Sequence, residues 1–474
     1  MSNTSQASAR INLLLDENSF VEIGAGITAR ATDFNPEPKA APSDGVVTGY
    51  GLIDGNLVYV YSQDASVMGG SIGEMHAKKI IGLYDLALKT GAPVIGLIDS
   101  TGLRLMEATD ALAAFGEIYK TQAMASGVVP QITAVFGSCG GGLSLFPAMT
   151  DFTIMEAVKG KIFVNSPNAI EGNYEEKLDT SASDFRSKEC GNVDVVASED
   201  EIYDKIRTLV SMLPSNNEDG GVYDECDDDL NRLLDDIDAC IKDSSVALSR
   251  IADNQLFYEI KADYAPSMVT GFMKMNGMTV GAVANRTEKY DEEGKVADKF
   301  PAVLTPAGCV KAAEFVNFCD AFDIPVLTLT NVTGFENTMC AEKKLSRAAA
   351  RLTYAFANAT VPKINVIVGD AFGSAYVVMN SKALGADIVF AWDNTSVGMM
   401  DADIAAKILF DKEDNKDELT KVYKETQTSV ESAARRGYVD TVIEAQDTRK
   451  YIIGALEMLF TKREGRPVKK HGAI

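Results

Sequence analysis

Histidine is scarce in this chain of 474 residues, which has only His76 and His471. This scarcity argues against a His-rich metal site and against a Ser-His-Asp catalytic triad. The seven cysteines are scattered, and no two of them form a C-x-x-C pair. We therefore expect reduced thiols in a cytoplasmic protein, with neither a zinc ribbon nor a disulfide framework, and no metal.

Long apolar runs and an excess of positive charge are also missing. No stretch of about 18 apolar residues could span a membrane, and the N-terminal segment carries no signal-peptide pattern. Lys and Arg number 45 against 68 Asp and Glu, which gives a formal net charge of −23. Nucleic acid is excluded as a partner because a protein needs a basic face to bind its phosphates.

The chain repeats itself at one fixed offset. PVIGLIDSTG from Pro93 resembles PVLTLTNVTG from Pro325, and PQITAVFGSCGGG from Pro130 resembles PKINVIVGDAFGS from Pro362. Pro93 and Pro325 are as far apart along the chain as Pro130 and Pro362, and we call this shared spacing the repeat offset. The repeat predicts an internal duplication, and the acidic stretch 214–253 marks the junction. We place a first domain at residues 1–242 and a second at residues 243–474.

Each copy alternates strand-length apolar runs with helical patterns, which is typical of an α/β fold with largely buried sheets. Asp54-Gly55 and Asn276-Gly277 predict tight hairpin turns. A polar linker is expected at the junction, leading into a helix near residues 230–242. The other helices are expected at residues 77–91, 111–125, 309–322 and 345–359.

Two glycine-rich turns carry the strongest chemical signal. GSCGGG (Gly137–Gly142) and GDAFGSA (Gly369–Ala375) each follow an apolar strand and precede a helical segment. Free amides at such a turn attract negative charge, so the pair predicts two oxyanion pockets. Preorganised amides of this kind stabilise the enolate of a thioester. Tight turns needed only for packing are the alternative.

Other motifs are weaker. GAGITA (Gly24–Ala29) loosely fits a dinucleotide fingerprint but lacks the following helix, so chance is the better explanation. Met273-Lys274-Met275 resembles a biotinylation site, but it lies on a hairpin arm and is interpreted as an ordinary strand lysine between core methionines. His76 could serve as a base, although a histidine at a helix start that is satisfied by the backbone or by a carboxylate fits better. The missing base favours a co-substrate that accepts the proton itself.

Several longer stretches resemble one family, the carboxyltransferase subunits of biotin-dependent acyl-CoA carboxylases and decarboxylases. The propionyl-CoA carboxylase β subunit and the methylmalonyl-CoA decarboxylase α subunit are the most similar members. The resemblance covers nearly the whole chain. It rests on DGVVTGYGLIDG (Asp44–Gly55), YSQDASVMGGSIGEMHAKKI (Tyr61–Ile80), YAPSMVTGF (Tyr264–Phe272), MNSKALGAD (Met379–Asp387) and the C-terminal stretch Arg435–Gly472.

The resemblance implies two tandem crotonase-like (ClpP/crotonase) domains that assemble as homo-oligomers, either dimers or hexamers. It implies a coenzyme A thioester as substrate and biotin carried by a separate biotin carboxyl carrier protein. Gly141 and Gly142, beside Gly140, would hold the acyl-CoA oxygen. Ser374 and Ala375, beside Gly373, would hold the ureido oxygen of biotin. A biotin carboxylase or a membrane decarboxylase subunit would be the further partner.

The chain departs from the family pattern at several places. Val377 replaces an aspartate that helps set acyl-chain choice, which puts propionyl specificity in doubt. The loops Thr333–Thr338 and Met400–Ala405 also differ, on the side where biotin is expected. Two alternatives therefore stay open: a biotin-independent acyl-CoA hydratase, isomerase or hydrolase on the same scaffold, and a non-catalytic scaffold subunit.

Overall fold

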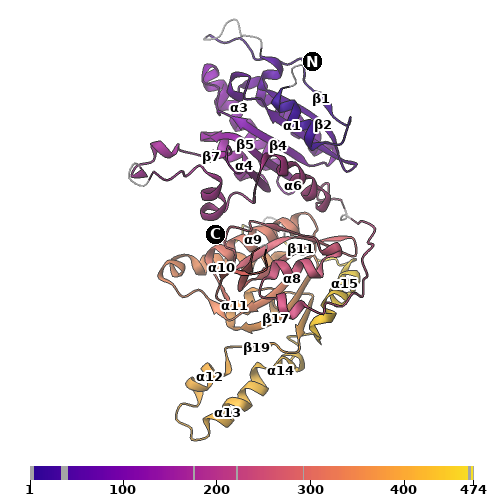
Figure 1. Ribbon diagram of the computed structural model, residues 1–474, viewed down its shortest axis with the longest axis vertical. Coiled ribbons are helices and arrows are strands. Elements are labelled where there is room, and N and C mark those ends of the chain that lie inside the picture. Colours follow the sequence, from indigo (N-terminus) through magenta and orange to yellow (C-terminus); the bar gives the residue numbers. More distant parts are fainter. Residues whose placement is uncertain are drawn as a thin grey trace. The chain divides into compact units, whose positions relative to one another are not determined.

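A computed structural model describes residues 5–33, 41–173, 177–219, 223–291, 293–467 and 471–472. The chain divides into two compact units, Met1–Gly220 and Gly221–Ile474. Each unit is built on one main sheet with helices packed against it (Figure 1).

Unit 1 contains a mixed sheet in the order β1-β2-β3-β4-β5-β6-β8, with β7 beside β5. Pairing is antiparallel from β1 to β3 and parallel from β3 onward. The strands are β1 (Val21–Ile23), β2 (Val46–Ile53), β3 (Asn56–Gln63), β4 (Val94–Ser100), β5 (Gln131–Gly140), β6 (Phe152–Glu156), β7 (Lys161–Phe163) and β8 (Val195–Ala197).

The helices of unit 1 confirm the predicted pattern. They are α1 (Gln6–Leu14), α2 (Glu74–Thr90), α3 (Ala108–Ala125), α4 (Leu145–Met149) and α6 (Glu199–Met212). Helix α2 ends where predicted, because Gly91 adopts the left-handed conformation with φ of 66° and its N–H bonds back to Ala87. The helices bury their apolar faces with the sheet in one core that includes Ile80, Ile98 and Phe146.

Unit 2 repeats this topology, with its sheet in the order β9-β10-β11-β15-β17-β18-β20 and β19 beside β17. Its main strands are β9 (Phe257–Ile260), β10 (Met268–Met275), β11 (Met278–Asn285), β15 (Val326–Val332), β17 (Lys363–Phe372), β18 (Ile388–Trp392), β19 (Ser396–Gly398) and β20 (Thr441–Ile443). Four short strands lie outside it: β12 (Glu288–Tyr290) pairs with β13 (Val296–Lys299), and β14 (Val303–Leu304) pairs with β16 (Gly334–Phe335).

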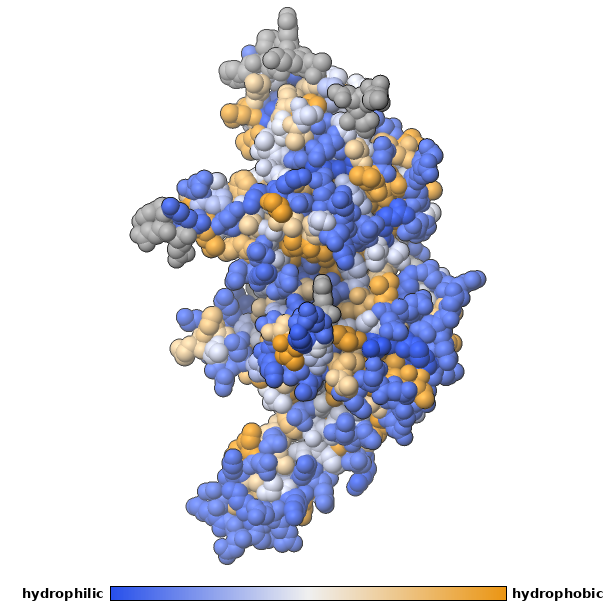
Figure 2. Space-filling view, viewed as in Figure 1, coloured by the Kyte–Doolittle hydropathy of each residue, from blue (hydrophilic) through white to orange (hydrophobic). Residues whose placement is uncertain are grey.

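The helices of unit 2 also follow the repeat. They are α7 (Ile237–Cys240), α8 (Ser244–Ile251), α9 (Pro306–Ala321), α10 (Met339–Asn358), α11 (Gly373–Val378), α12 (Ala402–Leu409), α13 (Lys416–Tyr423), α14 (Val430–Arg435) and α15 (Thr448–Leu459). Helices α12 and α13 form an arm whose surface is mostly hydrophilic (Figure 2).

Strand positions confirm the duplication. β4 and β15 span Val94–Ser100 and Val326–Val332, and β5 and β17 span Gln131–Gly140 and Lys363–Phe372. Within each pair the two strands begin and end at positions related by the repeat offset, and the strand orders of the two sheets coincide. The two units are therefore copies of one ancestral fold.

Both predicted hairpins are present. Asp54 and Gly55 have φ of 50° and 81°, and they join β2 to β3. Asn276 and Gly277 have φ of 51° and 75°, and they join β10 to β11. Positive φ at both central residues is the type I′ geometry, which matches the twist of paired strands.

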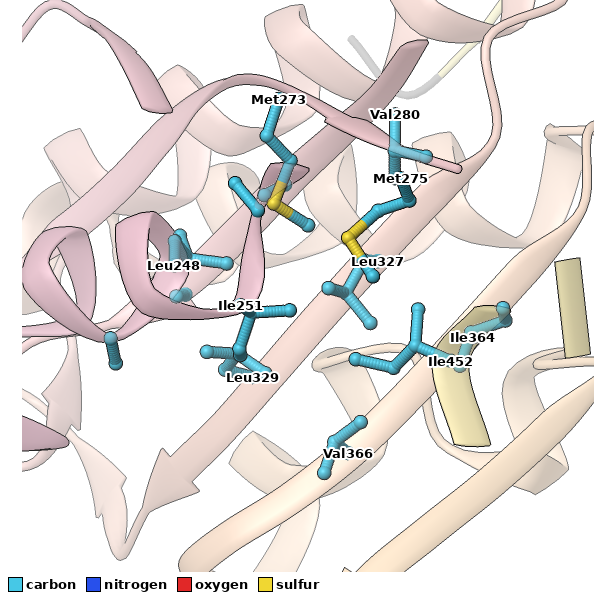
Figure 3. Close-up of a cluster of buried hydrophobic side chains, with 14 of the residues drawn as sticks. Leu248, Ile251, Met273, Met275, Val280, Leu327, Leu329, Ile364, Val366 and Ile452 are labelled. Carbon is cyan, nitrogen blue, oxygen red and sulfur yellow. The ribbon is translucent and has the colours of Figure 1, made fainter. Parts of the chain in front are cut away.

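Met273 and Met275 lie in the core of unit 2, between α8, β15 and α15 (Figure 3). Both side chains are fully buried, at 0% and 1% exposure. Lys274 between them forms an ion pair with Asp224. The interpretation of this tripeptide as part of an ordinary strand is therefore confirmed.

The junction segment differs from the sequence expectation. Residues 230–242 form turns and only the short helix α7, and Leu234 and Ile237 are buried in the core of unit 2. The two compact units divide at Gly220–Gly221 in the sequence, and the domain boundary after residue 242 stays a prediction. Residues 230–242 pack against unit 2 because the apolar side chains of Leu234 and Ile237, three residues apart, are buried in its core.

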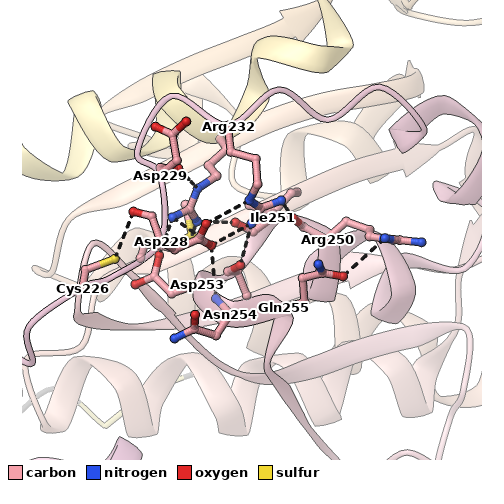
Figure 4. Close-up of polar contacts among 12 residues, drawn as sticks. Cys226, Asp228, Asp229, Arg232, Arg250, Ile251, Asp253, Asn254 and Gln255 are labelled. Carbon is pink, nitrogen blue, oxygen red and sulfur yellow. Dashed lines mark hydrogen bonds and ion pairs between the residues drawn. The ribbon is translucent and has the colours of Figure 1, made fainter.

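Buried charges reinforce this attachment (Figure 4). Arg449, which is fully buried, pairs with Asp253 at 2.6 Å and with Asp228 at 3.5 Å. Arg232 forms two hydrogen bonds with the Asp228 carboxylate and donates to the carbonyl oxygens of Arg250 and Ala252. Residues 228–253 of the acidic stretch are therefore held by a hydrogen-bonded ion-pair network, and this part is not a free linker.

Candidate active site

The first glycine-rich turn of unit 1 follows β5 and leads through the 3-10 helix η4 (Gly141–Ser144) into α4. Gly141 has φ of 62°, a conformation that favours glycine, and no atom lies within 4 Å of the position a Cβ would occupy there. Gly140 also needs to be glycine, because a Cβ would lie 2.5 Å from the Phe163 ring. The turn thus exposes its backbone to open space.

The amide of Gly142 is available for a ligand. As the second residue of η4 it has no intrahelical acceptor, and no other partner is recorded for it in the described part of the chain. Its carbonyl oxygen accepts a hydrogen bond of 2.8 Å from the Tyr119 hydroxyl. Ser144 Oγ donates to the Gly141 carbonyl at 2.7 Å. These bonds hold the two carbonyls and leave the N–H group free to interact.

The second turn is built in the same way. It follows β17 and opens α11, and Gly373 has the same φ of 62° as Gly141, its equivalent at the repeat offset. Ser374 and Ala375 occupy the first turn of α11, where their amides have no intrahelical acceptor. No other partner is recorded for these two amides across the described residues.

The predicted site residues thus form two groups, one in each unit. Gly140, Gly141 and Gly142 lie together in unit 1, and Gly373, Ser374, Ala375 and Val377 lie together in unit 2. Gly142 and Ser374, which are equivalent in the repeat, are both exposed. Val377 follows in α11 and is 41% exposed. Each group can donate backbone hydrogen bonds to an oxygen that gains negative charge.

His76 is not placed to act as a base. Its side chain is fully buried, and Nδ1 lies 3.0 Å from the Asp44 carbonyl oxygen. Nε2 lies 3.3 Å from Nε2 of Gln63, whose own oxygen accepts from the Asp99 amide. Burial lowers the pKa of His76 from 6.5 to about 3, and Arg104 contributes to the shift. The interpretation of His76 as a helix-start histidine satisfied by the backbone is confirmed.

The pentapeptide Gly69–Gly73 fits the G-x-S-x-G pattern of hydrolase nucleophiles, a match that sequence reasoning missed. Its Ser71 is buried, and the hydroxyl accepts a 3.3 Å hydrogen bond from Arg104 Nε. Arg104 Nη1 also pairs with Asp44 at 2.6 Å and with Glu107 at 2.9 Å. Because His76 is bonded elsewhere, Ser71 belongs to a structural ion-pair cluster and not to a triad.

The remaining weak motif, GAGITA, follows β1 and forms turns without a helix, so the structure offers no dinucleotide site there.

The described residues include no group of three or more His, Cys, Asp or Glu side chains positioned to bind a metal ion. Across the same residues, every helix is too short or too polar to cross a bilayer.

Comparisons with known proteins agree over the full chain. The family model of the carboxyl transferase domain matches residues 3–474. Methylmalonyl-CoA decarboxylase subunit alpha of Veillonella parvula is 41% identical, over 99% of this chain and 92% of its own length. The propionyl-CoA carboxylase beta chain of Saccharopolyspora erythraea is 39% identical, over 99% of this chain and 90% of its own length.

A solved structure of a similar protein has the same fold as this chain. The transcarboxylase 12S structure, a hexamer assembly with hydrolysed methylmalonyl-coenzyme A bound, superposes with a TM-score of 0.91. It is 37% identical in sequence, and the match covers 98% of this chain and 92% of that one. The expected architecture of two tandem crotonase-like domains is therefore confirmed.

Proposed function

Because this chain belongs to the carboxyl transferase family and is a carboxyltransferase, we propose that it exchanges a carboxyl group between carrier-bound biotin and an acyl-CoA. Methylmalonyl-CoA and propionyl-CoA are the proposed acyl pair, because similar relatives are named for these substrates. The observation that carries the proposal is the retention of both glycine-rich turns within a match that spans the whole chain.

In unit 1, the amides of Gly141 and Gly142 are proposed to hold the thioester oxygen of the acyl-CoA, with Gly140 allowing close approach. An enolate forms when the acyl α-carbon loses its proton or its carboxyl group, and its negative charge rests on this oxygen. The turn is suited to this role because its backbone is open to solvent and its carbonyls are already bonded. Preorganised donors stabilise such charge without the cost of reorienting water.

In unit 2, the amides of Ser374 and Ala375 are proposed to hold the ureido oxygen of biotin, with Gly373 setting the turn. When bound, carboxybiotin supplies the carboxyl group and accepts the proton from the acyl α-carbon. The residues present fit this group, because both amides lack an intrahelical partner and Gly373 keeps the required φ. Replacement of the family glycine by Ser374 leaves the N–H donor in place. Val377 is proposed to border the acyl group.

The burial of His76, the candidate base in the sequence, supports this division of roles. His76 is buried, neutral and bonded on both ring nitrogens, so it offers no lone pair to a substrate. A biotin-independent hydratase or hydrolase would require such a base at the turn. No contact of the described residues favours that alternative.

The partner proteins and the direction of the reaction are proposed from the family resemblance. The chain would work as a homo-oligomer, either a dimer or a hexamer, since transcarboxylase 12S is described as a hexamer. A biotin carboxyl carrier protein would deliver the biotin. A biotin carboxylase would drive carboxylation, whereas a membrane decarboxylase subunit would drive decarboxylation and place this cytoplasmic chain at a membrane.

The direct test is carboxyl exchange by the purified chain. It is mixed with carboxylated carrier protein and propionyl-CoA, and separately with methylmalonyl-CoA and biotin carrier. The proposal expects transfer that depends on biotin. Hydration or hydrolysis of the thioester without biotin would establish the rival enzyme class. A chain that binds but transforms no malonyl-, methylmalonyl- or glutaconyl-CoA would be a scaffold subunit.

A further inference from the structure

Ser144 lies buried beside the first glycine-rich turn, at the last position of η4. Its hydroxyl donates a hydrogen bond of 2.7 Å to the carbonyl oxygen of Gly141. This carbonyl and the N–H group of Gly142 belong to one peptide unit, since a single peptide bond joins the two residues. The C=O and N–H groups of a trans peptide such as this one point in opposite directions. The Ser144 hydroxyl therefore holds one end of the peptide unit whose other end is a proposed oxyanion donor.

Rotation of the Gly141–Gly142 peptide would turn this donor away from a ligand. Gly140, Gly141 and Gly142 are consecutive glycines, and a Cβ built on Gly141 would have no atom within 4 Å. Glycine allows a wider range of backbone angles than other residues, so neither side chains nor neighbouring atoms prevent the rotation at Gly141. The hydrogen bond from Ser144 opposes it, because rotation would take the acceptor away from a buried hydroxyl.

A second hydroxyl holds the next peptide unit along the chain. Tyr119 donates to the carbonyl oxygen of Gly142 at 2.8 Å. Burial raises the pKa of Tyr119, so the hydroxyl stays protonated and can donate at neutral pH. The Gly142 carbonyl shares its peptide unit with the N–H group of Leu143 and not with that of Gly142. Tyr119 thus supports the turn, whereas Ser144 acts on the donor peptide itself.

The second turn provides an internal reference. At the repeat offset Ser144 corresponds to Tyr376 of α11, and both side chains are buried. Gly141 and Gly373 share a φ of 62°, so the two turns have the same conformation at this position. Across the described residues of unit 2, no side-chain hydrogen bond is recorded to the carbonyl oxygen of Gly373 or Ser374. Hydroxyl anchoring is therefore a feature of the first turn and not a requirement of the common fold.

We propose that Ser144 is a positioning residue for carboxyl transfer, because its hydroxyl orients the Gly142 N–H group toward the thioester oxygen that gains negative charge. The inference rests on the proposed function, in which this oxygen becomes that of an enolate. A donor that is already oriented stabilises the charge without reorganising during the reaction. The bond from Ser144 also polarises the peptide unit, which strengthens its N–H group as a donor. Ser144 is buried and acts through this peptide, without touching the substrate.

The first experiment measures the steady-state kinetics of biotin-dependent transfer with propionyl-CoA. Ser144→Ala removes the hydroxyl, and we expect kcat to fall about 5- to 10-fold, as for the loss of one hydrogen bond. The KM for propionyl-CoA should stay within about twofold of the wild type, because the oriented donor matters mainly in the transition state. Ser144→Thr keeps a hydroxyl and should recover most of the lost kcat. A rise in KM with unchanged kcat in Ser144→Ala would overturn the proposal.

Ser183→Ala is the matched control. Ser183 of unit 1 is also buried, its hydroxyl donates at 2.7 Å to the Ala157 carbonyl, and it lies outside both glycine-rich turns. Both alanine variants should lose similar stability in thermal unfolding, and only Ser144→Ala should lose kcat. Equal loss of kcat in the two variants would reduce the effect to general destabilisation and overturn the proposal. Tyr119→Phe should lower kcat less than Ser144→Ala, and an equal or larger fall would assign the effect to the rigidity of the whole turn.

A second experiment measures binding by calorimetry, without turnover. The probes are propionyl-CoA and an analogue with a nitro group on the acyl α-carbon, whose ionised form spreads negative charge onto the thioester oxygen. The wild type should bind the ionised analogue more tightly than propionyl-CoA. Ser144→Ala should weaken binding of the analogue about 5- to 10-fold and change that of propionyl-CoA by less than about twofold. Equal affinity of the wild type for the two probes would show that no donor meets this charge and would overturn the proposal.

The two experiments together distinguish this inference from the proposed function. If affinity for the ionised analogue depends on Ser144 but no biotin-dependent transfer occurs with any substrate, the positioning role holds and the proposed reaction fails. If transfer occurs and Ser144→Ala equals the wild type in kcat and in affinity for the analogue, the proposed reaction stands and the role of Ser144 is wrong.

Discussion

Replacing Gly141 by valine tests the role of the first turn most sharply. Gly141 has φ of 62°, and no atom lies within 4 Å of a Cβ built on it. The Cβ of valine would therefore meet no neighbour, and we expect the side chain to fill part of the open space where the thioester oxygen is proposed to bind. We expect a folded protein that has lost transfer activity.

Gly141→Val should affect both the folding free energy and the activation free energy of the reaction. A side chain in the left-handed conformation costs about 1–2 kcal/mol of folding free energy. Loss of one oxyanion donor typically lowers kcat by about 10²–10³, or about 3–4 kcal/mol of activation free energy. A β-branched side chain that fills the site should reach the upper end of this range. The fall in activity should thus far exceed what the change in stability explains.

Gly172→Val is the matched control, because Gly172 in unit 1 has φ of 87° and also has nothing within 4 Å of a built Cβ. Biotin-dependent carboxyl exchange is measured for both variants, and thermal unfolding reports their stability. Both should lose similar stability, and only Gly141→Val should lose turnover. Near-normal turnover in Gly141→Val, with a stability loss equal to that of the control, would refute the oxyanion assignment.

Three further predictions concern buried charge. Because the pKa of His76 is lowered to about 3 in the fold, its contribution to the free energy of unfolding is complete above pH 6.5 and is lost as the pH falls toward 3. Urea unfolding from about pH 4 to pH 7 should show a shallower pH slope for His76→Gln, and an unchanged slope would contradict its buried neutral state. Arg104→Met leaves two buried carboxylates without a cation and should cost about 3–5 kcal/mol in urea unfolding, so a loss below about 1 kcal/mol would count against the ion-pair cluster. Arg449→Met should expose residues 223–253 to limited proteolysis before the rest of unit 2, whereas wild-type cleavage kinetics would show that the network does not dock the segment.

Features set by local conformation were predictable. Asp54-Gly55 and Asn276-Gly277 had to form tight hairpin turns, since few residue pairs accept positive φ at both central positions. Gly91 ended α2 for the same reason. The fixed repeat offset showed the duplication because both copies kept the glycines of their turns. Gly141 and Gly373 were thereby identified as equivalent from the sequence.

Long-range contacts were not predictable in this way. The segment near residues 230–242 has helical spacing, yet it forms mostly turns because burial of Leu234 and Ile237 against unit 2 outweighs local propensity. Its anchor, Arg449, lies far away in the sequence, near the C-terminal end of the chain. His76 could have been a base or a buried histidine, and only its contacts with Asp44 and Gln63 decided between them.

The sequence by itself determined the duplicated α/β fold, the hairpins and the two glycine-rich turns, because these follow from backbone conformation and from patterns repeated within one chain. Tertiary structure decided which groups of the two turns are open to solvent and which side chains are buried. It left the amides of Gly142 and Ser374 without hydrogen-bond partners among the described residues, and it buried His76 in contact with Asp44 and Gln63. Such outcomes depend on packing between distant segments, and no local rule of the sequence encodes them.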